Sequence, residues 1–281
     1  MTVDKWYLRK GVWWLVAVTL VAVYVGREVY GEYRRSFCAV GEEPPYEIPQ
    51  RHADDTLRVV IIGDSWAEYH SNLQCDTIFL RFAKRLTSRP VKCVARGKGG
   101  AKSGEIYYMM FSRLTDENPF EHDRCTQPLL EQHPDYCVVF AGINDVVHKR
   151  DADYYAGNLR NIIRLLLRLD IRPVVMEIPT VDYPEMIRRK EWHQRLLYAM
   201  ASLLPGAAGV AAESHRKALL DMLGSSNMAD SVLYIPAAAW NAEGLDDQRD
   251  IHTDDRVHLN LTGYRVLDSC IVSQIIDDAG L

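Results

Sequence analysis

The length and composition of the chain indicate one sizeable globular domain with residues to spare. Of 281 residues, 48% are hydrophobic and 25% are charged, with 17 Gly and 12 Pro. These values exclude collagen-like, low-complexity and wholly disordered chains. The net charge of −5 provides no basic excess to neutralise phosphates, so we expect no nucleic-acid partner.

The first 35 residues contain an apolar run. No charged residue occurs from Gly11 to Gly26, and basic residues lie on both sides. The run is short for a membrane span, but flanking aromatic and basic side chains extend its usable length. We therefore expect residues 1–35 to form an N-terminal transmembrane helix with its flanks. A cleaved signal peptide and a buried core helix are the alternatives.

Residues 36–56 are rich in proline and acidic residues and are predicted to tether the membrane segment to a domain over residues 57–281. Basic residues balance on the two sides of the apolar run, so the positive-inside rule does not set its orientation. The usual arrangement of N-terminal anchors favours a single-pass membrane protein. Its globular part would be extracytoplasmic, either periplasmic or on the cell surface.

Beyond the tether, short β-type runs alternate with helical patterns. The predicted strands are Leu57–Ile62, Val91–Ala95, Tyr136–Ala141, Pro173–Ile178 and Val232–Ile235. The predicted helices are Leu73–Leu86, Ser103–Leu114, Tyr154–Leu169, Glu185–Leu203, Val210–Leu223 and Thr262–Ile276. Repeated β-then-α order predicts an α/β fold in which helices cover both faces of a mostly parallel five-stranded sheet.

The six cysteines form no CxxC pair, which disfavours a zinc site or a thioredoxin-like motif. Cys93 and Cys137 lie in strand-like runs, where a cysteine is usually a small core residue. The even number of cysteines would permit disulfides in an exported domain, with Cys75 and Cys125 as the candidates.

Unusual residues follow the predicted strands, where the chemistry of parallel sheets collects. They are Gly63-Asp64-Ser65, the glycine-rich loop ending at Gly100, Gly142-Ile143-Asn144-Asp145, and Asp255-Arg256-Val257-His258. Each alone is an ordinary turn, helix cap or surface pair. Four such pieces at successive element ends, in this order, indicate a catalytic site.

In order and context these pieces match the four sequence blocks of the GDSL-like lipase/acylhydrolases, also called SGNH hydrolases. The resemblance covers roughly Leu57 to Ile276. It implies a compact three-layer α/β/α sandwich with a flavodoxin-like sheet, and ester chemistry that needs no metal or cofactor. The residue after the serine is Trp66, where the family name implies leucine, so the local packing departs from the family pattern.

The resemblance assigns catalytic roles to Ser65, His258 and Asp255. A serine hydroxyl needs an adjacent base to become a nucleophile. His258, with an ordinary pKa of about 6.5, can take that proton and return it to the leaving alcohol. Asp255 can hold the other ring nitrogen. The backbone N–H groups of Ser65 and Gly100 and the side-chain amide of Asn144 are the expected oxyanion hole.

Other polar residues are interpreted as structural. Asp64 and Asp145 are expected to hold turns. His70 is expected to face outward on the first helix, and His252 lacks the spacing to Asp255 that His258 has. His148 and the run Arg188-Arg189-Lys190 are interpreted as solvated surface.

The predicted function is therefore that of a serine esterase acting on short acyl esters, acetyl groups on carbohydrate being the favoured substrate. A lipase or lysophospholipase and an acyltransferase are the alternatives within the fold. A non-catalytic membrane-tethered scaffold is the alternative of another class; it is disfavoured because every expected polar role is filled.

Overall fold

The computed structural model describes residues 12–27, 46, 52–111, 125–148, 150–179, 183–201, 212–240 and 251–281. The chain divides into two compact units, Met1–Glu43 and Pro44–Leu281. In the first unit, residues 12–27 form a helix with exposed side chains. The predicted domain over residues 57–281 lies within the second unit.

The helices of the described ranges include none that is both long enough and apolar enough to cross a membrane. The predicted transmembrane helix is therefore unsupported by this structure. Most of the predicted tether lies outside the described residues.

A five-stranded, wholly parallel sheet forms the centre of the second unit. Its strands are β1 (Leu57–Gly63), β2 (Val91–Gly97), β3 (Tyr136–Phe140), β4 (Arg172–Met176) and β5 (Leu233–Ile235). Their order in the sheet is β2-β1-β3-β4-β5. After β2 the chain crosses back over β1 to form β3, so successive strands are added in opposite directions on the two sides of the β1–β3 pair. Gly63, at the end of β1, is in register with Gly97 on one side and Phe140 on the other. The predicted α/β fold with a five-stranded parallel sheet is confirmed.

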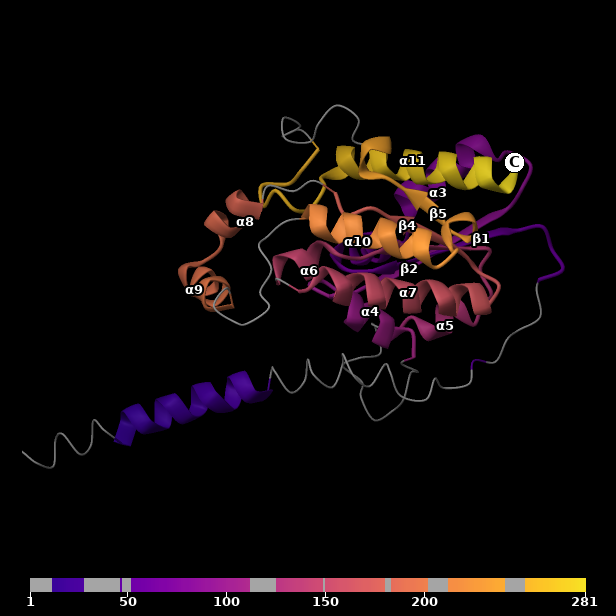
Figure 1. Ribbon diagram of the computed structural model, residues 1–281. Helices are drawn as coiled ribbons and strands as arrows, with labels where there is room; N and C mark the ends of the chain where they lie inside the picture. Colours follow the sequence, from indigo (N-terminus) through magenta and orange to yellow (C-terminus); the bar gives the residue numbers. More distant parts are fainter. Residues whose placement is uncertain are drawn as a thin grey trace, which may run out of the picture. The chain divides into compact units, whose positions relative to one another are not determined.

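Helices cover both faces of this sheet (Figure 1). Two of them, α3 (Asp76–Arg85) and α11 (Leu261–Ala279), pack together on one face. On the other face, α7 (Ala152–Arg168) contacts both α4 (Ser103–Met109) and α10 (Ala212–Ser225). The short helix α5 (Gln127–Leu130) precedes β3, and the short helix α6 (Ile143–Val147) follows it.

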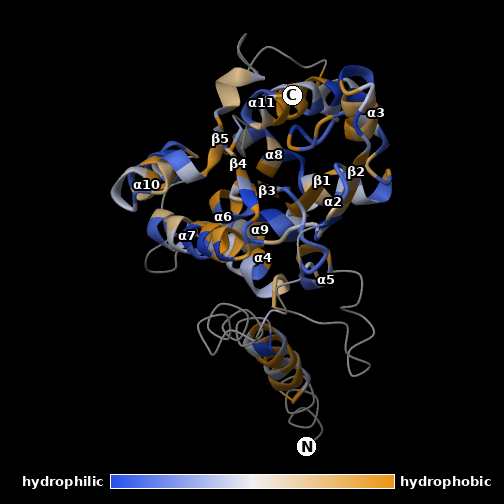
Figure 2. Cartoon of the chain, turned by 90° about the vertical axis from the view of Figure 1, so that its right-hand side faces the viewer, coloured by the Kyte–Doolittle hydropathy of each residue, from blue (hydrophilic) through white to orange (hydrophobic). Residues whose placement is uncertain are grey.

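The core lies between the sheet and these two layers. Ile61 and Ile62 of β1, Val138 and Val139 of β3, and Val174 of β4 are all completely buried. Continuous apolar runs of this kind are typical of parallel strands covered on both faces. In Figure 2 the strands lie inside the second unit, whereas hydrophilic residues, in blue, are visible on the outer helices α3 and α10.

The structure departs from the predicted helices in two places. The predicted helix Leu73–Leu86 corresponds to α3, and a further helix, α2 (Ser65–Asn72), precedes it; in the turn between them Gln74 and Cys75 have φ values of 50° and 59°. The predicted helix Glu185–Leu203 is divided into α8 (Tyr183–Arg189) and α9 (Trp192–Ala201). Residue types with good helix propensity occur across both breaks, so hydrophobic periodicity does not reveal them.

Candidate active site

Ser65 lies at the carboxyl edge of the sheet because β1 turns directly into α2 there. Gly63 has φ +147°, and a Cβ at this position would lie 2.1 Å from the Phe140 carbonyl oxygen. Only glycine therefore fits the turn. The buried side chain of Asp64 caps α2 by accepting a hydrogen bond of 3.0 Å from the Trp66 N–H. Ser65 is the first residue of the helix, whose initial N–H groups have no partner within the helix.

His258 and Asp255 approach Ser65 from the loop before α11. The His258 Nε2 lies 2.8 Å from the Ser65 Oγ, and the His258 Nδ1 lies 2.5 Å from the Asp255 Oδ2. The three side chains thus form one continuous hydrogen-bonded chain. Ser65 and His258 are 193 residues apart in sequence, and the parallel sheet brings them to the same edge.

Asp255 is held in place by its second oxygen. The Oδ1 accepts hydrogen bonds from the backbone N–H groups of Val257 and His258, both at 2.9 Å, and from the Thr253 hydroxyl at 2.8 Å. Partial burial favours the neutral carboxyl, but the hydrogen bonds from His258, Val257 and Thr253 prevail and lower the pKa of Asp255. The hydrogen bond to Asp255 raises the pKa of His258, against the effect of desolvation.

Gly100 lies in the loop after β2 and Asn144 in the first turn of α6, and both line the same cleft as Ser65. Gly100 has φ +77°, and a Cβ there would meet no protein atom, so its backbone is open to an incoming group. The Asn144 side-chain amide donates a hydrogen bond of 3.0 Å to the Ala101 carbonyl. Because an amide nitrogen carries two hydrogens, a second donor remains.

Asp145, in α6, connects this helix to the start of α4. Its carboxylate accepts hydrogen bonds from the Ser103 N–H at 2.9 Å and the Ser103 hydroxyl at 2.7 Å. Complete burial raises the pKa of Asp145 to about 6 despite those bonds. The expectation that Asp145 holds a turn agrees with these contacts, and the contacts fix the positions of Gly100 and Asn144 relative to each other.

A cleft of about 410 Å³ opens above these groups. It is lined by Ser65, Glu68, Gly99, Gly100, Ile143, Asn144, Val147, His148, Met186, Arg189, Lys190, Asp255, Val257 and His258. All five predicted site residues therefore line one cleft. Arg189, Lys190 and His148 also line it, although the sequence reading assigned them to solvated surface. The run of basic residues at 188–190 did not identify a site in the sequence, because helices on protein surfaces commonly carry such runs.

The prediction that His70 faces outward is wrong. Its side chain is completely buried and contacts the Trp66 carbonyl and the Asp268 carboxylate, each at 2.8 Å. The partner that makes this burial tolerable, Asp268, lies 198 residues away on α11. His252 forms a backbone bridge with Leu259, and it is His258 whose ring meets Ser65.

Trp66 points into the protein. It is 2% exposed and packs against the rings of Phe140, Trp240 and Tyr264 at centroid distances of 6.0 to 6.2 Å. The tryptophan that departs from the family pattern therefore fills the core beneath α2.

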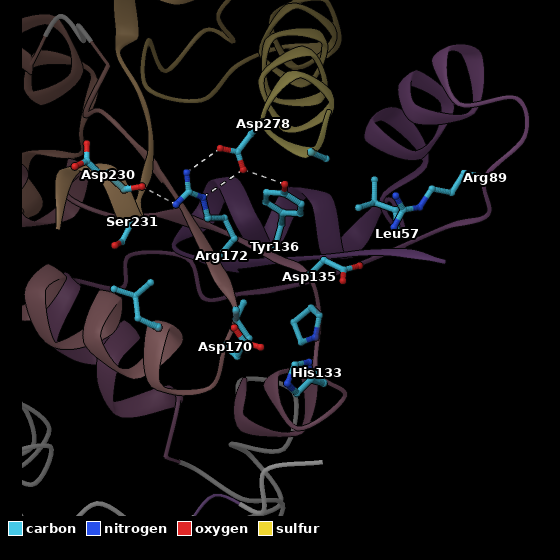
Figure 3. A pocket seen from close by; sticks show the side chains of 14 residues that line it. Leu57, Arg89, His133, Asp135, Tyr136, Asp170, Arg172, Asp230, Ser231 and Asp278 are labelled. Carbon is cyan, nitrogen blue, oxygen red and sulfur yellow. Dashed lines mark hydrogen bonds and ion pairs between the residues drawn. The ribbon is translucent and has the colours of Figure 1, made fainter. Parts of the chain in front are cut away.

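A hollow of about 520 Å³ lies elsewhere, at the edge where the strands begin (Figure 3). Leu57, Tyr136 and Arg172, the first residues of β1, β3 and β4, line it. Its charged groups engage one another: Arg172 donates to Asp278 at 2.8 Å, and the Tyr136 hydroxyl donates to the same carboxylate at 3.0 Å. Ser231 lines it, but among the described residues its hydroxyl forms no hydrogen bond to a histidine, so the smaller cleft is the better candidate.

In the described ranges Cys75, one of the two cysteines considered above for a disulfide, is a buried free thiol, and Cys125 is buried as well. Over the same ranges, no three His, Cys, Asp or Glu side chains are grouped to hold a metal ion.

Comparison with known proteins identifies the family. The GDSL-like lipase/acylhydrolase family model matches residues 61–266. A search of curated proteins finds no significant match. Among solved structures, the chain is similar to a lipase/acylhydrolase from Enterococcus faecalis, with 16% identity, a TM-score of 0.56, and coverage of 79% of this chain and 96% of that one.

Two acetylxylan esterases are similar as well. One shares 22% identity at a TM-score of 0.53, covering 78% of this chain and all (100%) of the other. The second, from Geobacillus stearothermophilus, shares 15% identity at a TM-score of 0.50, covering 78% and 94%. At these identities the likeness shows the fold. With the family match over most of its length, the chain belongs to the GDSL-like lipase/acylhydrolase family, whose members are hydrolases acting on ester bonds.

Proposed function

We propose that this protein is a serine esterase in which Ser65 is the nucleophile, His258 the general base and acid, and Asp255 the residue that orients His258. The observation that carries the proposal is the unbroken hydrogen-bonded chain from the Ser65 Oγ to the Asp255 carboxylate, at the floor of an open cleft. These are the contacts that a serine needs to attack an ester at neutral pH.

The first half-reaction forms an acyl-enzyme. The Ser65 Oγ attacks the ester carbonyl carbon while its proton passes to the His258 Nε2, 2.8 Å away. Asp255 stabilises the imidazolium that forms. The carbonyl oxygen becomes negative, and the N–H groups of Ser65 and Gly100 together with the Asn144 amide donate to it. His258 then protonates the leaving alcohol, and the carbon–oxygen bond to that alcohol breaks.

The second half-reaction releases the acid. Water takes the place of the alcohol, His258 removes its proton, and the resulting oxygen attacks the acyl-serine through the same oxyanion site. Ser65 leaves with the proton returned from His258. No other group is required, since proton transfer and charge stabilisation are both supplied by the side chains and backbone named above.

We propose short acyl groups, acetyl first, on a carbohydrate alcohol as the substrate. Polar and charged side chains make up much of the cleft lining, and the bulk of Trp66 is committed to the core rather than to an acyl channel beside Ser65. A long-chain lipase needs a continuous apolar channel for its acyl chain. The acetylxylan esterases among the similar structures make acetylated xylo-oligosaccharides a sensible substrate to test.

Two measurements test this function. A fluorophosphonate probe should label the wild-type protein and leave the Ser65→Ala variant unlabelled; equal labelling of both would rule out Ser65 as the nucleophile. Hydrolysis of acetyl, butyryl and octanoyl esters of one chromophore should be fastest for acetyl. A maximum at octanoyl would replace the proposed substrate class with lipids.

We also propose that the apolar residues 11–26 attach the domain to a membrane, with the domain on the extracytoplasmic side. The absence of charge across this run supports the proposal. Protease added to sealed right-side-out membrane vesicles should digest the domain. Protection from external protease, with digestion only after lysis, would contradict the proposed side.

A further inference from the structure

Three consecutive basic residues at the end of α8 differ in what they contact. The Arg188 and Arg189 guanidinium groups each lie 2.8 Å from the Glu185 carboxylate. Arg189 also donates a hydrogen bond of 2.7 Å to the Asp254 carbonyl, next to Asp255. The two arginines therefore have structural partners, and Arg189 ties α8 to the loop that carries the catalytic pair.

Lys190 has no such partner. Its ammonium forms no ion pair or hydrogen bond in the part of the chain that the structure describes, although the residue is half-buried and lines the cleft. Its positive charge opposes the rise in the pKa of His258 that the hydrogen bond to Asp255 causes. Binding sites for anions share this feature: a half-buried cation that lines the substrate cleft and forms no ion pair with an acidic residue.

Side chains of opposite charge line different parts of the cleft. Glu68 lies beside the glycine loop, where its carboxylate oxygen would be 2.7 Å from a Cβ placed on Gly99. Lys190 lies instead beside the catalytic loop, because the neighbouring Arg189 is hydrogen-bonded to the Asp254 carbonyl and Lys190 lines the same cleft as His258, whose Nε2 hands the proton to the departing alcohol. An anionic group on the alcohol would therefore meet Lys190, whereas one near the oxyanion loop would meet the negative charge of Glu68.

We propose that Lys190 binds a carboxylate or phosphate on the alcohol part of the ester, so that the preferred substrate is an acylated acidic molecule, such as a sugar acid, rather than a neutral one. This inference rests on the proposed esterase function. A lysine ammonium is a compact point charge on a flexible stem, suited to either oxyanion. In Lys190→Met the stem remains and the charge is removed; Arg188→Met, on the same helix, is the matched control because Arg188 does not line the cleft.

The test compares three acetyl esters with similar phenolic leaving groups: methyl 4-acetoxybenzoate, 4-acetoxybenzoate and 4-acetoxyphenyl phosphate. For the full chain at low ionic strength, kcat/KM should be higher for at least one anionic ester than for the neutral one. Lys190→Met should lower that preference about tenfold or more, the factor expected when a hydrogen bond to a charged group is lost. The preference is the ratio of kcat/KM for the anionic ester to kcat/KM for the neutral ester in the same variant, so a change in the pKa of His258, which affects both esters alike, cancels.

Further variants separate the possible outcomes. Arg188→Met should keep the wild-type preference, and Lys190→Arg should retain most of it because the charge is kept. Which anionic ester responds identifies carboxylate or phosphate as the recognised group. An unchanged preference in Lys190→Met, or no preference in the wild type, would overturn the proposal while leaving the esterase intact. Neutral-ester hydrolysis that survives in Ser65→Ala would instead overturn the proposed function itself.

Discussion

In the described part of the chain, two histidine–aspartate pairs use the same chemical groups in opposite surroundings. In the cleft, the side chains of His258 and Asp255 are 40% and 47% exposed and lie 2.5 Å apart. Under α2, those of His70 and Asp268 are both 0% exposed and lie 2.8 Å apart. The first pair comes from one turn of chain, whereas the second joins α2 to α11.

The difference in surroundings sets what each pair can do. His258 presents its second ring nitrogen to Ser65, a group that can exchange a proton with it. The second ring nitrogen of His70 contacts the Trp66 carbonyl, which can only accept a hydrogen bond and cannot exchange a proton. His258 can therefore pass a proton between Ser65 and a substrate, whereas His70 links α2 to α11 inside the core.

Replacing His258 should have the largest effect on catalysis. We expect His258→Gln to lower kcat/KM for an acetyl ester by about 10⁵- to 10⁶-fold, because the nucleophile loses its base. The melting temperature should change by no more than about 2 °C, as for other partly exposed positions. A variant that keeps even a tenth of the wild-type rate would show that another group removes the proton from Ser65.

Replacing Asp255 should have the next largest effect. In Asp255→Asn the side chain keeps its size, but it no longer stabilises the imidazolium, and we expect kcat to fall about 10⁴-fold. Steady-state rates on the same ester measure this loss. Asp254→Asn, next in the sequence, is the control and should retain wild-type kcat; a similar loss in both would indicate damage to the loop rather than to the triad.

Replacing one partner of the buried pair should affect stability instead. His70→Ala leaves Asp268 buried without its partner and should lower the free energy of unfolding by about 3–5 kcal/mol. Urea unfolding measures this change. The double variant His70→Leu/Asp268→Leu should recover much of the loss, since an apolar pair needs no desolvated charge. A rate loss per folded molecule as large as that of His258→Gln would assign His70 to catalysis and contradict the comparison.

The pH dependence should separate the two pairs by a smaller effect. Asp255 raises the pKa of His258 above 6.5, and a protonated imidazole cannot act as base. The kcat/KM profile should therefore decline below a midpoint that lies above pH 6.5. The residual activity of Asp255→Asn should show its midpoint at lower pH, because the charge that favours the imidazolium is gone. His70→Gln should leave the midpoint in place; a shift there would couple the buried pair to the base.

The sheet and the central groups of the site could be predicted because their signals are local. Each strand is an apolar run that closes on a turn, and Asp255 and His258 are close enough in sequence for their spacing to have meaning. Ser65 is identifiable because Gly63, with its φ of +147°, must be glycine for β1 to turn into α2. Parallel pairing then places the strand ends at one edge, which brings these residues together.

The remaining features depend on contacts that the sequence does not display. His70 is buried because Asp268, 198 residues later, meets it, and no pattern around His70 reveals that partner. Lys190 lines the cleft at the break between α8 and α9. In the sequence it belongs to a run of basic residues, and such a run is typical of a solvent-exposed helix. Gln74 and Cys75 adopt the left-handed conformation in the turn between α2 and α3. Hydrophobic periodicity carries no signal of such a turn at residues other than glycine.

The positions of the triad residues along the chain also govern when activity can arise during folding. Asp255 and His258 are three residues apart, whereas Ser65 meets His258 across 193 residues. Short-range contacts cost little loop-closure entropy, and long-range contacts form late. A folding chain can therefore pair its base with the carboxylate early, yet it obtains a reactive serine only when the end of β1 and the loop before α11 have come together. Until that step it carries every chemical group of the enzyme without being one.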